Sequence, residues 1–215
     1  MVSRKKQLRK KQWEELDLAK FKLLPSAKPP FFHGSTVRKA AQYFWNKKLR
    51  PAVLEQQENK CSICGWVPGK EEDIKRLHLH ELENYDFQNK VCQLIEIKLI
   101  CRDCHSLQHI GRTKSVLSKE QWENLMEHFI KVNGCSPDID FDLVLAKSIK
   151  SEGHFEAQRK MTFEMTLEER MKLAKKTVRF TINPEIPLAE ELKMHLMKRE
   201  LLYAGSDMKE DKEND

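Results

Sequence analysis

The chain has 215 residues, of which 40% are hydrophobic and 33% are charged. This length suits one compact domain, or a small domain with helical extensions. No run approaches the roughly 18 apolar residues of a membrane-spanning helix, and no apolar stretch follows the basic N-terminus as in a secretory signal. We therefore expect no membrane association and a cytoplasmic protein.

The net charge of +6 is unevenly distributed along the chain. Residues 1–50 contain 14 Lys and Arg against 3 Asp and Glu, whereas the remainder contains 25 against 30. Such a basic arm suits an anionic polymer, because each neutralised phosphate releases condensed counterions. The alternative is a solvated, lysine-rich helix. The residues expected to contact nucleic acid are Lys5, Lys6, Arg9, Lys10, Lys11, Lys47, Lys48 and Arg50.

The first sixty residues are predicted to be helical with one break. A basic helix is expected over residues 3–24, and the prolines of residues 25–30 end it. A second helix is expected over 36–48, and it resumes after Pro51 because proline is tolerated in a first helical turn.

The character of the chain changes at residue 60. Residues 76–83 and 91–100 have the apolar and alternating patterns of strands, with a turn over 84–90 between them. A short helix is predicted to follow and to stop near Gly111. Later elements are a helix opened by the Ser118-x-x-Gln121 capping box, helices over 137–150, from Thr166 and from Pro187, and a short strand over 178–182. These elements predict an α+β fold.

Four of the six cysteines form two Cys-x-x-Cys pairs, Cys61 with Cys64 and Cys101 with Cys104. Two such pairs complete the tetrahedral four-sulfur site that zinc prefers. A hairpin fits between the pairs and brings them together. We therefore predict a structural zinc.

Four histidines lie close to these cysteines in the sequence. His78 and His80 share one strand face, and His105 and His109 share one helix face. A zinc that ties the helix to the hairpin lets His80, His105 and His109 converge, with Glu81 adjacent. Such a cluster can hold a catalytic divalent metal, whereas His78 is equally well explained as a packed strand residue.

These motifs resemble the HNH (His-Asn-His) endonucleases, which have the ββα-metal fold, and in particular a small bacterial subgroup with a structural zinc held by four cysteines. The matching stretches are Cys61-x-x-Cys64-Gly65, Leu77-His78-Leu79-His80-Glu81 and Leu99-Ile100-Cys101-Arg102-Asp103-Cys104-His105-x-x-x-His109. The strong part of the match covers about a quarter of the chain. It consists of short motifs, which suggest a function.

The resemblance implies a metal-dependent endonuclease that hydrolyses phosphodiester bonds in DNA. It implies a catalytic divalent metal (Mg, Mn, Ni or Zn) held by His80, His105 and His109, and a base at the His80-Glu81 position. The family's usual strand pair is Asp-His or His-His, so either Glu81 is the base, or His80 is the base and the metal relies on His105 and His109. The family's central asparagine corresponds to Asn84 or Asn89.

Two other functions remain open. A catalytically inactive HNH-like zinc module would bind nucleic acid without cleaving it, and a zinc-stabilised interaction domain would bind protein. The predicted organisation is a basic helical arm and linker (residues 1–34), a nuclease-like domain with flanking helices (35–155), a C-terminal helical extension (156–205) and a disordered tail (206–215).

Overall fold

The computed structural model describes residues 4–205, except for the side chains of residues 4–6 and 8. The predicted polar tail lies outside this range. The helices are α1 (Arg4–Glu15), α2 (Val37–Ala40), α3 (Gln42–Phe44), α4 (Arg50–Gln56), α5 (Arg102–Gln108), α6 (Ile110–Val116), α7 (Lys119–Asn133), α8 (Phe141–Glu152), α9 (His154–Glu164), α10 (Leu167–Lys175) and α11 (Ala189–Met197). The strands are β1 (Leu77–Asp86), β2 (Val91–Cys101) and β3 (Arg179–Ile182).

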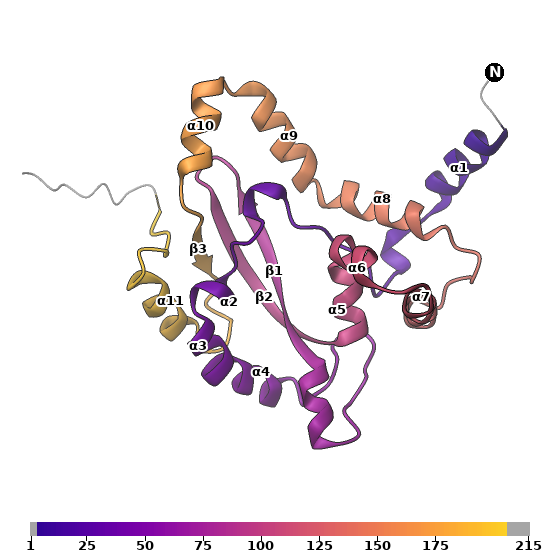
Figure 1. Ribbon diagram of the computed structural model, residues 1–215, viewed down its shortest axis with the longest axis horizontal. Helices are drawn as coiled ribbons and strands as arrows, with labels where there is room; N and C mark the ends of the chain where they lie inside the picture. The colour runs from indigo at the N-terminus through magenta and orange to yellow at the C-terminus, as the bar shows by residue number, and fades with distance from the viewer. Residues whose placement is uncertain (1–3, 206–215) are drawn as a thin grey trace, which may run out of the picture. The chain divides into compact units, whose positions relative to one another are not determined.

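The three strands form one sheet in the order β1-β2-β3 (Figure 1). The turn 87–90 joins β1 to β2, and so short a connection makes the two strands antiparallel. β3 pairs with β2 in parallel, from Val91 opposite Arg179 to Leu94 opposite Ile182. The described residues therefore form a mixed α and β structure with a small sheet, as predicted.

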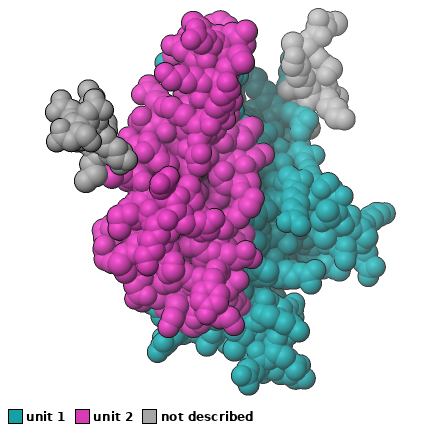
Figure 2. Space-filling model, turned by 60° about the vertical axis from the view of Figure 1, so that its left-hand side comes forward, with its two compact units in different colours: residues 1–29, 54–80, 98–160 teal, residues 30–53, 81–97, 161–215 magenta. Residues whose placement is uncertain are grey.

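The chain divides into two compact units (Figure 2). Unit 1 comprises residues 1–29, 54–80 and 98–160, and unit 2 comprises residues 30–53, 81–97 and 161–215. Both cysteine pairs and the histidines at 78, 80, 105 and 109 belong to unit 1. The four-part division drawn from the sequence stays a prediction.

The interior of unit 1 is built from the apolar faces of its strands and helices. On β1, Leu77 and Leu79 are buried, and the alternation of a strand places His78 and His80 on the other face, as predicted. On α7, Leu125 and Phe129 are buried at helical spacing. The predicted Ser118–Gln121 capping box is present at its start, and Gly134 ends the helix in the left-handed conformation, at φ 61°.

A segment without regular secondary structure, residues 21–25, packs against the helices of unit 1. Leu23 is fully buried, and its backbone N–H and C=O both bond to the Asn133 side chain, at 2.9 and 3.0 Å. The Gln108 amide donates to the Leu24 carbonyl, and the Ser148 hydroxyl donates to the Pro25 carbonyl. These side chains satisfy backbone groups that have no partners within a helix or a sheet.

Replacing Asn133 with alanine should lower the free energy of unfolding by about 1–3 kcal/mol, because it leaves both backbone groups of buried Leu23 without this partner. Urea denaturation of the full chain measures the change. The control is Asn124→Ala, an exposed position on the same helix, which should change stability by less than about 0.5 kcal/mol. Equal effects of the two substitutions would contradict this role for Asn133.

Several element boundaries differ from the sequence predictions. α1 ends at Glu15 rather than near residue 24, and Asp17 caps a separate 3-10 turn over Leu18–Lys20. β1 continues to Asp86 rather than Glu83. The predicted stop at Gly111 is wrong, because α6 runs through it and the break lies at His109 instead, with φ −116° and ψ 43°.

Helix content in the C-terminal third also differs from the prediction. The helix α9 was not predicted, and the final helix begins only at Ala189, after Leu188 in the left-handed conformation. Other predictions in this region are confirmed: the capping box of Thr166 and Glu169 opens α10, and β3 falls where a short strand was expected.

Candidate metal centres

Cys61, Cys64, Cys101 and Cys104 form one cluster in which all four sulfur atoms lie within 4.8 Å of one another. The Sγ atoms of Cys64 and Cys101 are 3.6 Å apart, far longer than a disulfide bond of about 2.05 Å. Thiolates at about 2.3 Å from a tetrahedral zinc lie about 3.8 Å from one another. The four cysteines therefore suit a structural metal ion, as the sequence predicted.

Local backbone geometry brings the first pair into the cluster. The N–H of Gly65 donates to the Cys61 carbonyl at 2.9 Å, and Gly65 has φ +74°, a conformation that favours glycine. The N–H of Cys61 donates to the Trp66 carbonyl at 2.8 Å, which closes the loop. The N–H of Ser62 then donates to the Leu99 carbonyl, so this loop is joined to β2.

The second pair is positioned by the junction of β2 with α5. Cys101 is the last residue of the strand and the N-cap of the helix, and its sulfur accepts a hydrogen bond from the Cys104 N–H at 3.5 Å. Cys101 and Cys104 are both buried. A strand that runs directly into a helix thus fixes both thiols without a loop.

Burial and mutual hydrogen bonds shift the pKa values of the four cysteine thiols in opposite directions. Hydrogen bonds from the Cys101 and Cys104 thiols hold the pKa of Cys61 far below its usual range. The pKa of Cys104 is raised far above its usual range, first by its hydrogen bond to Cys101, and burial raises the pKa of Cys64. Four adjacent thiols cannot all lose their protons without a cation to balance the charge. Binding of a metal ion there would therefore release protons and would weaken as the pH falls.

His128 is a member of this region that the sequence analysis missed. Its Nε2 lies 3.2 Å from the Cys104 sulfur. Hydrogen bonds from neighbouring side chains to metal-ligating sulfurs orient the ligand and tune its charge. The available signal was the position of His128 on α7, three residues after buried Leu125 and therefore on the same helix face.

His80, His105 and His109 form a second cluster, in which one ring nitrogen from each residue lies within 4.8 Å of the others. The ring centroids of His105 and His109 are 4.5 Å apart, and those of His80 and His109 are 5.2 Å apart. Nitrogens bound to one ion at about 2.0–2.1 Å lie roughly 3–3.5 Å apart. Small rotations of the rings would therefore place all three on one divalent ion.

The break between α5 and α6 positions His109. The buried Thr113 hydroxyl donates to the Ser106 carbonyl at 2.7 Å and to the His109 carbonyl at 3.1 Å, which holds the chain across the break. His105 lies one residue after Cys104, so the cysteine cluster fixes its position. The His78 ring stacks on the His105 ring, with centroids 4.8 Å apart and planes 18° apart.

Glu81 does not belong to the histidine cluster. Its Oε1 accepts a hydrogen bond from the backbone N–H of Arg38 at 3.2 Å, and in a strand it points away from the face that carries His80. The candidate asparagines also lie outside the cluster. Asn84 accepts from the N–H of Tyr85, and the Asn89 amide donates to Asp86 in the hairpin turn.

The predicted phosphate-binding residues differ in their surroundings. Arg9 forms an ion pair with Asp140 at 3.1 Å, and Lys10 and Lys11 pair with Glu14 and Glu15 one turn away. Lys47 and Lys48 are exposed. Arg50 is half-buried, and burial lowers its pKa. The side chains of Lys5 and Lys6 lie outside the described residues.

Among the residues that the structure describes, no helix is both long and apolar enough to cross a bilayer. No protein-family model, curated protein or solved structure matches this chain.

Proposed function

We propose that this protein is a metal-dependent endonuclease of the HNH type that hydrolyses phosphodiester bonds in DNA. The observation that carries the proposal is the convergence of His80, from β1, with His105, from α5, and His109, from the break between α5 and α6, beside four clustered cysteines. The cysteine cluster would hold a structural zinc, and the histidine cluster would hold a catalytic Mg, Mn, Ni or Zn ion. Among these ions, neutral imidazoles suit nickel and zinc, whereas magnesium and manganese prefer oxygen ligands, which the phosphate and water would supply.

A divalent ion at the histidines would supply electrostatic stabilisation of the charge that develops on the phosphate and on the departing oxygen. The remaining chemistry belongs to the chain. One group must accept a proton from the attacking water. His80 takes this role if His105 and His109 alone hold the ion. If all three histidines hold it, Glu81 can take the role only after its carboxylate leaves the Arg38 backbone N–H.

The test is a plasmid-nicking assay on the full chain. EDTA-treated protein with zinc restored at one ion per chain should nick supercoiled plasmid only after Mg²⁺, Mn²⁺ or Ni²⁺ is added. Failure with every ion, in a protein that still binds DNA, would favour the second candidate, an inactive module that binds nucleic acid. The engagement of Glu81 by the Arg38 backbone is the observation that supports this second candidate.

Salt dependence tests the predicted role of the basic arm. The double substitution of Lys10 and Lys11 by glutamine should weaken DNA binding and make the slope of log affinity against log salt shallower by up to about 2, because each lost phosphate contact removes about 0.9 from the slope. Sequence preference should not change, since phosphate contacts carry little sequence information.

The matched control for this experiment is Lys119→Gln, which removes one exposed positive charge from α7. Fluorescence anisotropy over a salt series gives both slopes. An unchanged slope in the double variant would show that α1 does not contact the backbone of DNA.

A further inference from the structure

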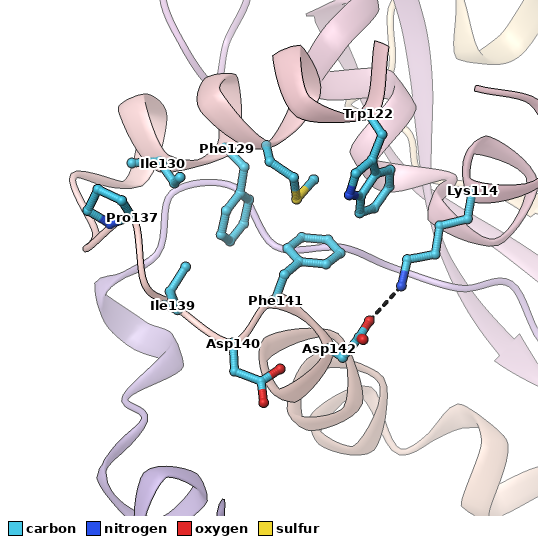
Figure 3. A pocket seen from close by; sticks show the side chains of 10 residues that line it. Lys114, Trp122, Phe129, Ile130, Pro137, Ile139, Asp140, Phe141 and Asp142 are labelled. Atoms are coloured by element: carbon cyan, nitrogen blue, oxygen red, sulfur yellow. Dashed lines mark hydrogen bonds and ion pairs between the residues drawn. The ribbon is translucent and has the colours of Figure 1, made fainter. Parts of the chain in front are cut away.

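A pocket of about 410 Å³ lies in unit 1 (Figure 3). None of its lining residues belongs to the cysteine cluster or to the histidine cluster. α6, α7 and α8 and the loop before α8 contribute its walls. Its volume falls within the range of small-molecule sites, which are mostly apolar with a few placed polar groups. The lining residues used below are Lys114, Trp122, Phe129, Asp140, Phe141 and Asp142.

Three aromatic rings form an open box in this pocket. The Phe141 ring is nearly perpendicular to the Phe129 ring, at 89° with centroids 5.0 Å apart, and to the Trp122 ring, at 81° and 5.6 Å. Phe141 lies between the other two rings (Figure 3). Phe129 is fully buried, whereas Trp122 and Phe141 are partly exposed. The π faces of these two rings are therefore the ones open to a ligand, and such negative faces attract organic cations.

Two carboxylates complete the negative side of the pocket. Asp140 caps the start of α8 through the Leu143 N–H and pairs with Arg9. Asp142 pairs with Lys114 at 2.5 Å, and this pair is exposed, with 39% of the Lys114 side chain and 68% of the Asp142 side chain accessible. The lining residues carry two negative charges and one positive charge, and Arg9, which is outside the lining, balances Asp140. Asp142 is therefore the carboxylate that loses its partner when Lys114 is displaced.

The chain itself already places an ammonium group against these rings. The Lys114 Nζ lies 5.3 Å from the Trp122 ring centroid and 5.7 Å from that of Phe141. A lysine ammonium is compact and strongly hydrated, and an exposed ion pair holds it only weakly. A more weakly hydrated cation loses less hydration free energy than the lysine ammonium when it binds to the same rings.

We propose that this pocket binds a small organic ammonium ion, with its alkylated nitrogen against the Trp122 and Phe141 rings, where the Lys114 ammonium now lies, and its charge facing Asp142. The Lys114 ammonium competes for the same position. This site does not depend on the nuclease proposal, because none of its residues belongs to either cluster.

The experiment is calorimetric titration of the full, zinc-loaded chain with choline and with its uncharged tert-butyl isostere. The two probes have nearly the same shape, so the comparison isolates the charge. Choline should bind on the order of tenfold more tightly than the isostere, the size of effect expected for a desolvated cation on aromatic rings. Equal affinities, or no choline binding at millimolar concentration, would overturn the proposal.

Three variants locate the binding. Asp142→Asn and Phe141→Leu should each weaken choline binding several-fold, because they remove a charge and a π face while keeping the size of the side chain. Lys114→Met should strengthen it, because it removes the competing ammonium. The control is Glu123→Gln, which removes a negative charge from α7 outside the pocket lining and should leave the affinity unchanged.

The same variants test whether the pocket binds an anion or a nucleobase instead of an organic cation. Weaker choline binding by the Lys114→Met variant would mean that Lys114 contacts the ligand, as it would for an anion, and the proposal would fail. Adenosine that binds more tightly than choline and is unaffected by Asp142→Asn would assign the aromatic box to a nucleobase instead.

Discussion

Replacing Cys104 with serine should abolish stoichiometric zinc binding and unfold the segment between the two cysteine pairs. Cys104 is fully buried, its backbone N–H donates to the Cys101 sulfur, and its own sulfur lies 3.2 Å from the His128 Nε2. Structural zinc supplies about 10–16 kcal/mol to small modules at neutral pH, which is as large as the total stability of about 5–15 kcal/mol of a typical native protein. Loss of one thiolate should therefore remove the largest single contribution to the fold of unit 1.

Metal analysis by mass spectrometry and amide hydrogen exchange over residues 61–109 measure these effects. The matched control is Cys135→Ser, because Cys135 is half-buried and lies outside the cysteine cluster. The control should retain one zinc per chain and native exchange rates. A Cys104→Ser protein that keeps one zinc, or that folds normally without it, would contradict a structural role for the cluster.

Replacing His105 with alanine should lower the rate of plasmid nicking by about 10²–10⁴, the range expected for loss of a group that acts at the reacting centre. His80→Ala should lower it by a similar factor. The two substitutions differ in their effect on the metal. His105→Ala should weaken binding of the catalytic ion under either assignment of the base, because His105 is a ligand in both.

His80→Ala distinguishes the assignments. If the variant binds the ion normally but nicks slowly, His80 is the base, and if the ion is lost as well, His80 is a ligand and Glu81 becomes the candidate base. The control is His33→Ala, an exposed histidine outside the cluster, which should behave as the parent does. Parental nicking rates in both His80→Ala and His105→Ala would refute the assignment of the site.

The sequence predicted the cysteine cluster well because the ligand spacing is local and strict. The spacing within each Cys-x-x-Cys pair already brings its two sulfur atoms close together. Only the distance between the two pairs depends on the fold. The histidine cluster could be predicted for a similar reason, since His78 and His80 share a strand face and His105 follows a cysteine directly. Periodicity alone places such side chains, provided that the strand and the helix are correctly assigned.

Other features depend on tertiary contacts that no local pattern contains. The break at His109 follows from the hydrogen bonds of Thr113, and Gly111 therefore does not end the helix. His128 meets Cys104 only because α7 packs against α5. Glu81 was a candidate base by adjacency, but the Arg38 backbone, 43 residues earlier in the chain, engages its carboxylate.

The most direct test of the nuclease proposal is to count bound ions and measure nicking on the same preparation. Protein with one zinc per chain is titrated with Mn²⁺, and each sample is divided between metal analysis and a plasmid assay. The proposal predicts that nicking is absent with one ion per chain and rises in step with binding of a second ion, and that His105→Ala lacks both. Full binding of a second ion without any nicking, or full nicking by protein that holds zinc alone at the cysteines, would contradict it.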